Sequence, residues 1–328
     1  MPAGLIEATQ LTRAGRLMEA TAAIQRMLRQ EPCIDVPFSR VEETKLPEAP
    51  PGAFISGSFT NAAGTRPYKL YIPDGYSGKA LPLIVMLHGC TQTPDDFAAG
   101  TRMNALAQER NCFILYPEQT QAANRSRCWN WFKRGHQRRD QGEPAIIAGM
   151  TREVISRYAI NERKVYVAGL SAGGAMAAVM GAAYPELYAA VGIHSGLAVG
   201  SAHDVPSAFA AMRGTPRSSS SGARSGAGAV PLILFHGDRD KTVHPRNSEQ
   251  VIESVGHTGT QASVEHGQVP NGHAYTRTLH KDATGRVLLE HWLVHGAGHA
   301  WSGGSPSGSY TDPKGPDAGL AMMRFFDQ

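Results

Sequence analysis

The sequence predicts an α/β fold in which a doubly wound, mainly parallel β-sheet carries helices on both faces. Short and continuously apolar runs such as Leu83–Leu87 and Val230–Phe235 recur along the chain. Runs of this kind are typical of strands that are buried on both faces of a parallel sheet. Helical patterns separate the runs, as between Cys112–Tyr116 and Val165–Ala168. This alternation of strand and helix favours a parallel sheet.

Length and composition fit one large domain that follows an N-terminal extension. The chain has 328 residues, 41% of them hydrophobic, which is enough for one large core. Residues 1–52 are predicted to form an amphipathic helix or helical hairpin over about residues 5–29 and a proline-rich linker, and residues 53–328 the large domain. The net charge of +4 is too small to indicate nucleic acid as a partner. No run approaches the roughly 18 apolar residues of a membrane span, so we expect no transmembrane segment.

The elements of the domain are expected in a regular order. They are strands Ala53–Thr60, Tyr68–Ile72 and Leu83–Leu87, a helix Asp95–Arg110, a strand Cys112–Tyr116, a helix Pro144–Tyr158, a strand Val165–Ala168, a helix Gly174–Ala183, and strands Ala189–Ile193, Val230–Phe235 and Val287–Leu293. The segment 214–229 is rich in Ser, Gly, Ala and Arg. Such composition predicts a flexible surface loop.

One strand-to-helix turn carries the most informative motif, Gly169-Leu170-Ser171-Ala172-Gly173. A Gly-x-Ser-x-Gly sequence in this setting is the nucleophile elbow of α/β-hydrolases, although a plain strand-to-helix turn is the alternative. The turn is so sharp that side chains two residues to either side of the serine would collide, which explains both glycines. We therefore expect Ser171 to be a nucleophile and the Ala172 N–H to point at the same space.

A nucleophilic serine needs a base and a group that orients the base, and in this fold the order is Ser, then Asp or Glu, then His. Asp240 is preferred as the acid over Asp238, because Asp238 is expected to satisfy N–H groups of its own turn. His299 is preferred as the base over His295, because it follows the final strand in a glycine-rich loop. The two histidines are four residues apart, but the glycines between them argue against a helix and therefore against a zinc site.

The second half of an oxyanion hole should follow the strand Leu83–Leu87. His88 and Gly89 come next, and a His-Gly step there turns the following N–H, that of Cys90, toward the nucleophile. Cys90 and Ala172 would thus supply two donors to a developing oxyanion. We interpret His88 as a support that hydrogen-bonds to backbone, not as a catalyst.

These motifs together resemble those of poly(3-hydroxybutyrate) depolymerase-type esterases, whose core is shared by feruloyl and acetylxylan esterases. The resemblance covers about residues 50–328 and rests on motifs in the family's order: Leu87-His88-Gly89-Cys90-Thr91-Gln92, Cys128-Trp129-Asn130-Trp131-Phe132, Gly169 to Met176, His236-Gly237 with Asp240, and Gly298-His299-Ala300-Trp301. It implies an α/β-hydrolase fold and a serine carboxylesterase. Ser171 would be its nucleophile, Asp240 its acid and His299 its base, with no cofactor and no metal.

The resemblance also bears on cysteines and tryptophans near the site. It places the loops of Cys90 and Cys128 near each other, which leaves open whether they form a disulfide. Trp129, Trp131 and Trp301 are expected near the catalytic residues, where they would bind substrate or pack in the core.

The remaining expectations concern substrate and location. The predicted partner is an ester, either a short-chain hydroxyalkanoate polyester or oligomer or a feruloyl or acetyl ester of a plant polymer. The sequence does not indicate an oligomeric state. Because no signal peptide is visible, a cytoplasmic location is the default, and secretion in a trimmed form is the alternative.

Overall fold

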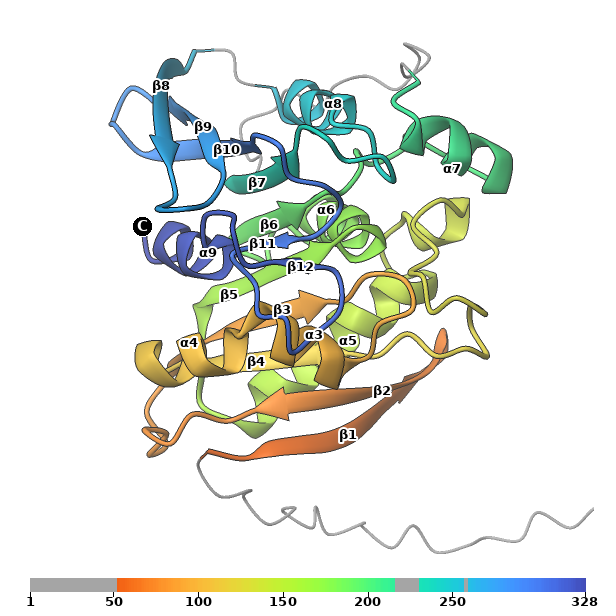
Figure 1. The fold of residues 1–328 in the computed structure, drawn as a ribbon. Helices are drawn as coiled ribbons and strands as arrows, with labels where there is room; N and C mark the ends of the chain where they lie inside the picture. Colours follow the sequence, from red (N-terminus) through yellow and green to blue (C-terminus); the bar gives the residue numbers. More distant parts are fainter. Residues whose placement is uncertain (1–51, 216–229, 257–258) are drawn as a thin grey trace, which may run out of the picture. The chain divides into compact units, whose positions relative to one another are not determined.

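The computed structural model describes residues 52–215, 230–256 and 259–328. The predicted N-terminal helix, the proline-rich linker and nearly all of the predicted loop 214–229 lie outside these residues, and so these three expectations stay predictions. Figure 1 shows the described part as a twisted sheet with helices packed on it.

The strands of the main sheet are β1 (Phe54–Asn61), β2 (Gly64–Tyr71), β3 (Leu81–Leu87), β4 (Phe113–Pro117), β5 (Ile160–Leu170), β6 (Ala190–His194), β7 (Leu232–Gly237), β8 (Gln261–Gln268), β9 (Ala274–Lys281) and β10 (Val287–Val294). The helices are α3 (Pro94–Thr101), α4 (Met103–Arg110), α5 (Gly142–Arg157), α6 (Ala172–Ala183), α7 (Val205–Met212), α8 (Arg246–Val255) and α9 (Ala318–Phe326). A short 3-10 turn, η1 (Arg134–His136), precedes α5, and the strands β11 (Trp301–Ser302) and β12 (Thr311–Asp312) form a small separate ladder.

Six neighbouring strands form the parallel centre of the sheet, in the order β4-β3-β5-β6-β7-β10. Antiparallel β2 and β1 extend one edge, and antiparallel β9 and β8 extend the other. The prediction of a mainly parallel α/β sheet is therefore confirmed. The β8–β9 hairpin was not predicted, because β8 is exposed at nearly every position and carries no apolar run.

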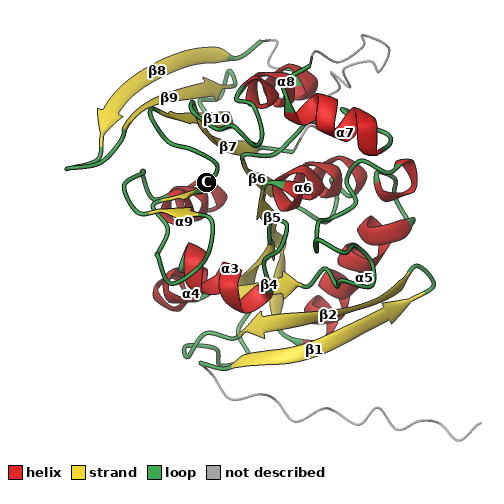
Figure 2. Cartoon of the chain, turned by 45° about the vertical axis from the view of Figure 1, so that its right-hand side comes forward, coloured by secondary structure: helices red, strands yellow, loops and turns green. Residues whose placement is uncertain are grey.

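Both faces of the central strands are covered by helices. Leu83, Val85 and Leu87 of β3 belong to the core on the side of α5 and α6, whereas Ile84 and Met86 belong to the core on the side of α4 and α9. Side chains that alternate in this way between two buried faces explain why the strands read as continuous apolar runs. Figure 2 shows α5 and α6 on one side of the strands and α3, α4 and α9 on the other.

The prediction of one helix over Asp95–Arg110 is wrong, because Arg102 breaks it into α3 and α4. Arg102 has a left-handed φ of 57° and its N–H donates to Ala98 O at 3.0 Å, which ends α3. Its guanidinium contacts the carbonyl of Gly303 at 3.2 Å and the carboxylate of Asp317. A tertiary contact with the distant C-terminal segment thus accompanies a break that local helix propensity does not predict.

Because the six central strands are parallel, their carboxyl ends all point the same way, and ligands of such folds bind beyond these strand ends. The loops after β3, β5, β6, β7 and β10 all leave from these ends. Within the described segments, no helix has the length and apolar character required to cross a bilayer.

Candidate active site

The chain turns sharply at Ser171, between the end of β5 and the start of α6. Ser171 adopts φ 57° and ψ −119°, a conformation that non-glycine residues rarely adopt and that costs about 1–3 kcal/mol. Its N–H donates to the carbonyl of His194 at the end of β6, at 2.8 Å. Tertiary structure therefore holds a strained serine at the edge where the parallel strands end.

Close backbone approach explains the two glycines of the motif. A Cβ on Gly173 would lie 2.0 Å from the carbonyl oxygen of Leu87, at the end of β3. A Cβ on Gly169 would lie 2.4 Å from the carbonyl carbon of Gly173. The reason given from the sequence, that the turn has no room for side chains at these two positions, is confirmed.

Asp240, in the loop after β7, holds the imidazole of His299, in the loop after β10. His299 Nδ1 lies 2.6 Å from Asp240 Oδ2, while Oδ1 accepts the N–H groups of Thr242 and Val243, each at 2.8 Å. Burial by itself raises the pKa of Asp240, but hydrogen bonds from His236 and His299 outweigh it and hold this pKa below its usual range. The carboxylate therefore stays ionised and accepts the Nδ1 proton, which leaves Nε2 of His299 free to act as a base.

The structure gives the two competing aspartates different histidines. Asp238 Oδ2 lies 3.0 Å from His295 Nδ1, and its Oδ1 accepts the N–H of Gly296 at 2.7 Å. Asp238 thus joins its loop to the loop after β10, whereas the expectation was that it serves its own turn. His295 and His299 face different carboxylates, and only the carboxylate of Asp240 is fully buried.

His194 connects the serine turn to the loop that carries His299. Its carbonyl accepts the N–H of Ser171, and its ring Nε2 accepts the N–H of Ser302 at 2.9 Å. The ring stacks on Trp301, with 5.2 Å between ring centroids. Burial lowers the pKa of His194 to about 3, so the ring is neutral and keeps Nε2 as an acceptor. Ser171 Oγ itself makes no hydrogen bond within the described residues, a geometry that is common before substrate binds.

The loop after β3 is anchored by His88, as the sequence analysis expected. His88 Nδ1 lies 2.7 Å from the carbonyl oxygen of Gly89, and its Nε2 accepts the N–H of Gln119 at 3.0 Å. Trp129 Nε1 donates to the carbonyl of His88 at 3.1 Å. Burial lowers the pKa of His88 to about 4, which keeps the ring neutral and these roles unchanged near pH 7.

The N–H of Cys90 has no partner among the described residues, whereas the N–H groups on both sides of it are used. Gly89 N–H donates to Gln92 Oε1 at 2.9 Å, and Thr91 N–H donates to the carbonyl of Ser126 at 2.7 Å. Within the described part of the chain, the Cys90 N–H donates to no protein atom. A Cβ on Gly89 would lie 3.7 Å from Ser171 Cβ, so this loop passes close to the serine. A fixed loop with one free donor beside the serine has the form of an oxyanion hole.

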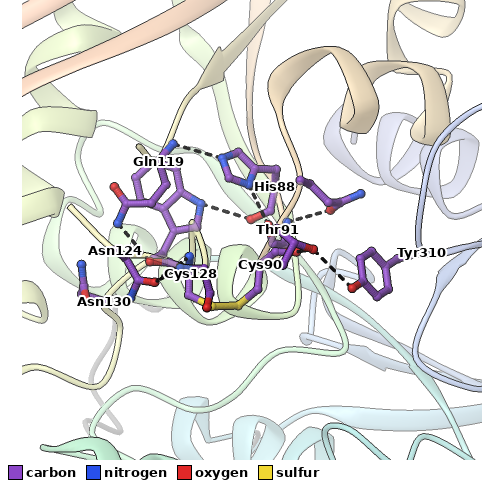
Figure 3. The surroundings of a disulfide bond; sticks show 12 residues. His88, Cys90, Thr91, Gln119, Asn124, Cys128, Asn130 and Tyr310 are labelled. Carbon is purple, nitrogen blue, oxygen red and sulfur yellow. Dashed lines mark hydrogen bonds between the residues drawn. A yellow bond between two sulfur atoms is a disulfide. The ribbon is translucent and has the colours of Figure 1, made fainter. Parts of the chain in front are cut away.

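A disulfide joins this loop to the segment of Cys128 (Figure 3), and a buried carboxylate holds that segment. Cys90 and Cys128 are bonded, which settles the pairing that the sequence left open. Glu143, at the start of α5, accepts the backbone N–H of Asn130 at 2.7 Å and its side-chain amide at 2.6 Å. Gln119 also donates to Glu143 and to the carbonyl of Cys128. Glu143 is fully buried, so each of these donors satisfies a charge that would otherwise be costly.

The three tryptophans are buried, which does not fit the expectation that they bind substrate. Trp129, Trp131 and Trp301 are 0%, 6% and 1% exposed. Trp129 supports His88, and Trp301 lies between His194 and Phe97. The alternative interpretation of core packing agrees with the structure, because none of the rings offers an exposed face.

Several residues that build the site could not be recognised from the sequence. His194, Gln92 and Glu143 were given no role. His194 could have been suspected, because it is a polar residue at the carboxyl end of a central strand, where ligands of such folds bind. Nothing in the local sequence marks Glu143, because its partners come from separate parts of the chain.

Comparison with known proteins agrees with the fold and the motifs. The acetyl xylan esterase from Aspergillus awamori superposes with a TM-score of 0.66 at 20% identity, over 83% of this chain and 99% of that one. At this identity the likeness shows the fold, which is that of the α/β-hydrolases.

Curated relatives are more similar in sequence. Poly(3-hydroxyalkanoate) depolymerase C of Paucimonas lemoignei is 32% identical over 255 residues, which cover 75% of this chain and 60% of the relative. Feruloyl esterase B of Neurospora crassa is 28% identical over 256 residues, which cover 73% of this chain and 85% of the relative. The family model described as Esterase PHB depolymerase matches residues 66–258, more than half of the chain. The chain therefore belongs to the PHB depolymerase esterase family.

Proposed function

We propose that this protein hydrolyses carboxylic esters through a covalent acyl-enzyme on Ser171. The observation that carries the proposal is the 2.6 Å contact between Asp240 Oδ2 and His299 Nδ1. It lies at the same end of the parallel strands as the sharp turn at Ser171. An oriented imidazole and a serine on a strained turn are the parts that acyl transfer requires. Family membership supports the same chemistry.

In the first step His299 Nε2 takes the proton of Ser171 Oγ while the oxygen attacks the ester carbonyl carbon. Asp240 keeps the ring oriented and stabilises the imidazolium. The N–H groups of Cys90 and Ala172 stabilise the oxyanion, an effect of about 3–4 kcal/mol per donor in mutational tests. Ala172 opens α6, so its N–H has no partner within the helix.

The tetrahedral intermediate then collapses, the bond to the alcohol oxygen breaks, and His299 returns its proton to that oxygen. Water attacks the acyl-enzyme in the second step, again losing a proton to His299. The acid is released, and Ser171 regains its hydroxyl. All proton transfers pass through the one imidazole that Asp240 orients.

The substrate class that we propose is a short-chain hydroxyalkanoate polyester or oligomer. The relative from Paucimonas lemoignei, at 32% identity, supports this choice. The second candidate, a feruloyl or acetyl ester of a plant polymer, is supported by the relative from Neurospora crassa. Acyl transfer at Ser171 is common to both.

The Cys90–Cys128 disulfide supports function in an oxidising compartment rather than in the cytoplasm. Disulfides persist outside the reducing cytosol. This one lies in the loop after β3 (residues 88–92), which we call the oxyanion loop. Export therefore fits the bond better than the cytoplasmic default that the sequence suggested.

The test is acid release from amorphous poly(3-hydroxybutyrate), with methyl ferulate and acetylated xylan in parallel and Ser171→Ala as the blank. We expect release from the polyester and a loss of at least about a thousandfold in Ser171→Ala. Its thermal unfolding should stay close to that of the wild type, because Ser171 Oγ makes no hydrogen bond within the described residues.

Turnover retained by Ser171→Ala would refute the nucleophile. Turnover of ferulate or acetylxylan without polyester release would assign the enzyme to plant-polymer esters and leave the mechanism intact.

A further inference from the structure

We propose that Tyr310 is a positioning residue that holds the oxyanion loop against the loop that carries His299. The inference rests on the proposed function, because it assigns Tyr310 a part in placing the Cys90 N–H. Tyr310 lies far along the chain from Cys90, and nothing in the sequence marked it as part of the site. Figure 3 shows its ring beside Thr91 and its hydroxyl directed at the threonine.

The backbone of Tyr310 is tied to the His299 loop. Its carbonyl accepts the N–H of Trp301 at 2.7 Å, two residues after His299, where the β11–β12 ladder begins. Tyr310 has a positive φ of 52°. Such a conformation is uncommon for an aromatic residue and persists only where the surroundings hold it.

The side chain of Tyr310 reaches the oxyanion loop. Its hydroxyl lies 3.3 Å from Thr91 Oγ1, and Thr91 Oγ1 donates to the carbonyl of Cys90 at 2.6 Å. A threonine hydroxyl has one proton, and this one is used on Cys90. Tyr310 is therefore the donor to Thr91, and the two hydroxyls form a directed chain that ends on the Cys90 peptide.

The hydrogen bonds from Tyr310 to Thr91 and from Thr91 to Cys90 add to the restraints on the backbone around the Cys90 N–H. The peptide before Cys90 is held through its carbonyl by His88, and the carbonyl of Cys90 itself is held through Thr91 and Tyr310. Thr91 also has a positive φ, 66°, so the backbone just after Cys90 is strained. Without the Tyr310 hydroxyl, Thr91 keeps its bond to the Cys90 carbonyl but loses its tie to the His299 loop, so the orientation of Cys90 loses one of its restraints.

A second bridge joins the same two loops and shows that their contact is extensive. Gln92 Nε2 donates to the carbonyl of Ser309 at 3.1 Å, while Gln92 Oε1 accepts the Gly89 N–H. Ser309 N–H in turn donates to Asp96 at 2.8 Å. The bridge through Gln92 keeps the loops together when the tyrosine hydroxyl is removed, so the variant tests fine positioning and not folding.

Tyr310 is 48% exposed, which makes it a suitable site for substitution. Removing its hydroxyl creates no cavity in the core and leaves no buried group without a partner. A change in kcat of Tyr310→Phe would therefore not come from damage to the core.

The experiment compares Tyr310→Phe, Thr91→Val and the double variant with the wild type. Hydrolysis of p-nitrophenyl butyrate gives kcat and KM, and a trifluoromethyl ketone, which forms an oxyanion on the serine, gives Ki. We expect each single variant to lower kcat about fivefold with KM nearly unchanged, as for the loss of one neutral hydrogen bond. Ki should rise by a similar factor, because the inhibitor resembles the transition state.

Tyr71→Phe is the matched control. Tyr71 ends β2, and its hydroxyl donates to Gln108 Oε1 at 2.7 Å. It pairs with Ile114 near the amino end of β4, whereas the site lies at the carboxyl ends of the parallel strands. This variant removes a comparable hydroxyl and should leave kcat and Ki unchanged.

The double variant shows whether the Tyr310 and Thr91 hydroxyls act together or independently. If the hydroxyls act as one chain, the double variant loses no more than the larger single loss, whereas independent effects would multiply. Unchanged kcat and Ki in Tyr310→Phe, or a fully multiplicative double variant, would overturn the inference. If Ser171→Ala is inactive and Tyr310→Phe is normal, this inference fails while the proposed function stands. A Ser171→Ala variant that keeps its activity removes both.

Discussion

Burial distinguishes Asp238 from Asp240, which lie two positions apart on the same loop. The side chain of Asp240 is fully buried and bonded to His299, whereas that of Asp238 is 34% exposed and bonded to His295. When a buried carboxylate is removed, water cannot reach the site and take over its hydrogen bond. Loss of the Asp240 carboxylate should therefore leave the His299 imidazole without its orienting partner. The exposed pair is screened by solvent and should contribute little.

We therefore expect Asp240→Asn to lower kcat by about 10⁴, because the amide no longer stabilises the correct tautomer and charge of His299. Asp238→Asn should lower kcat less than about tenfold, through a looser loop only. Steady-state kinetics of the two purified variants on one soluble ester gives both values. The reverse ranking would show that the acid is Asp238.

The oxyanion loop depends on elements on either side of it, not on its own hydrogen bonds alone. The Cys90–Cys128 disulfide joins it to the segment before α5, and Glu143 at the start of α5 holds that segment. Closing a loop over a separation of 38 residues contributes about 4 kcal/mol in the chain-entropy treatment.

Cys128→Ala should accordingly lower both the free energy of unfolding and kcat. We expect about 2–4 kcal/mol in guanidinium unfolding, the usual range for one disulfide. Dithiothreitol should reduce the stability and activity of the wild type and have no further effect on Cys128→Ala. A wild type that is indifferent to reductant would contradict a role of the bond in the loop.

The domain carries neutral histidines deep inside it, and these make its stability depend on pH. Burial lowers the pKa of His88 to about 4 and that of His194 to about 3, from the ordinary histidine value of 6.5. The unfolded chain takes up protons at these positions below pH 6.5, while the folded chain does not. Their contribution is therefore complete above pH 6.5 and is lost as the pH falls toward 4 for His88 and 3 for His194.

Between pH 7.5 and pH 5 we expect the free energy of unfolding to fall by about 2 kcal/mol for each of the two histidines. Guanidinium unfolding at both pH values measures this fall. His88→Gln and His194→Gln should each show a smaller fall than the wild type, whatever their absolute stability. An equal fall in all three proteins would mean that other groups cause the acid sensitivity.

Local sequence determined the strands and the nucleophile turn, because both rest on neighbouring residues. Strands buried on two faces must be apolar throughout, so β3, β4 and β7 could be recognised. The glycines around Ser171 are required by a turn that the same five residues make. The order of Ser, Asp and His in this fold, and the positions of the two loops after their strands, led to Asp240 and His299, and the family resemblance implied the same two residues.

Long-range contacts decided the rest. The exposed strand β8 has no apolar run, and local helix propensity does not predict the break at Arg102. The burial of the three tryptophans depends on what packs over them. The supports of the site come from distant segments, Tyr310 for Thr91 and His194 for the His299 loop. A pattern along the chain predicts which residues are buried in an element, but only the folded chain places a donor from one loop against an acceptor in another.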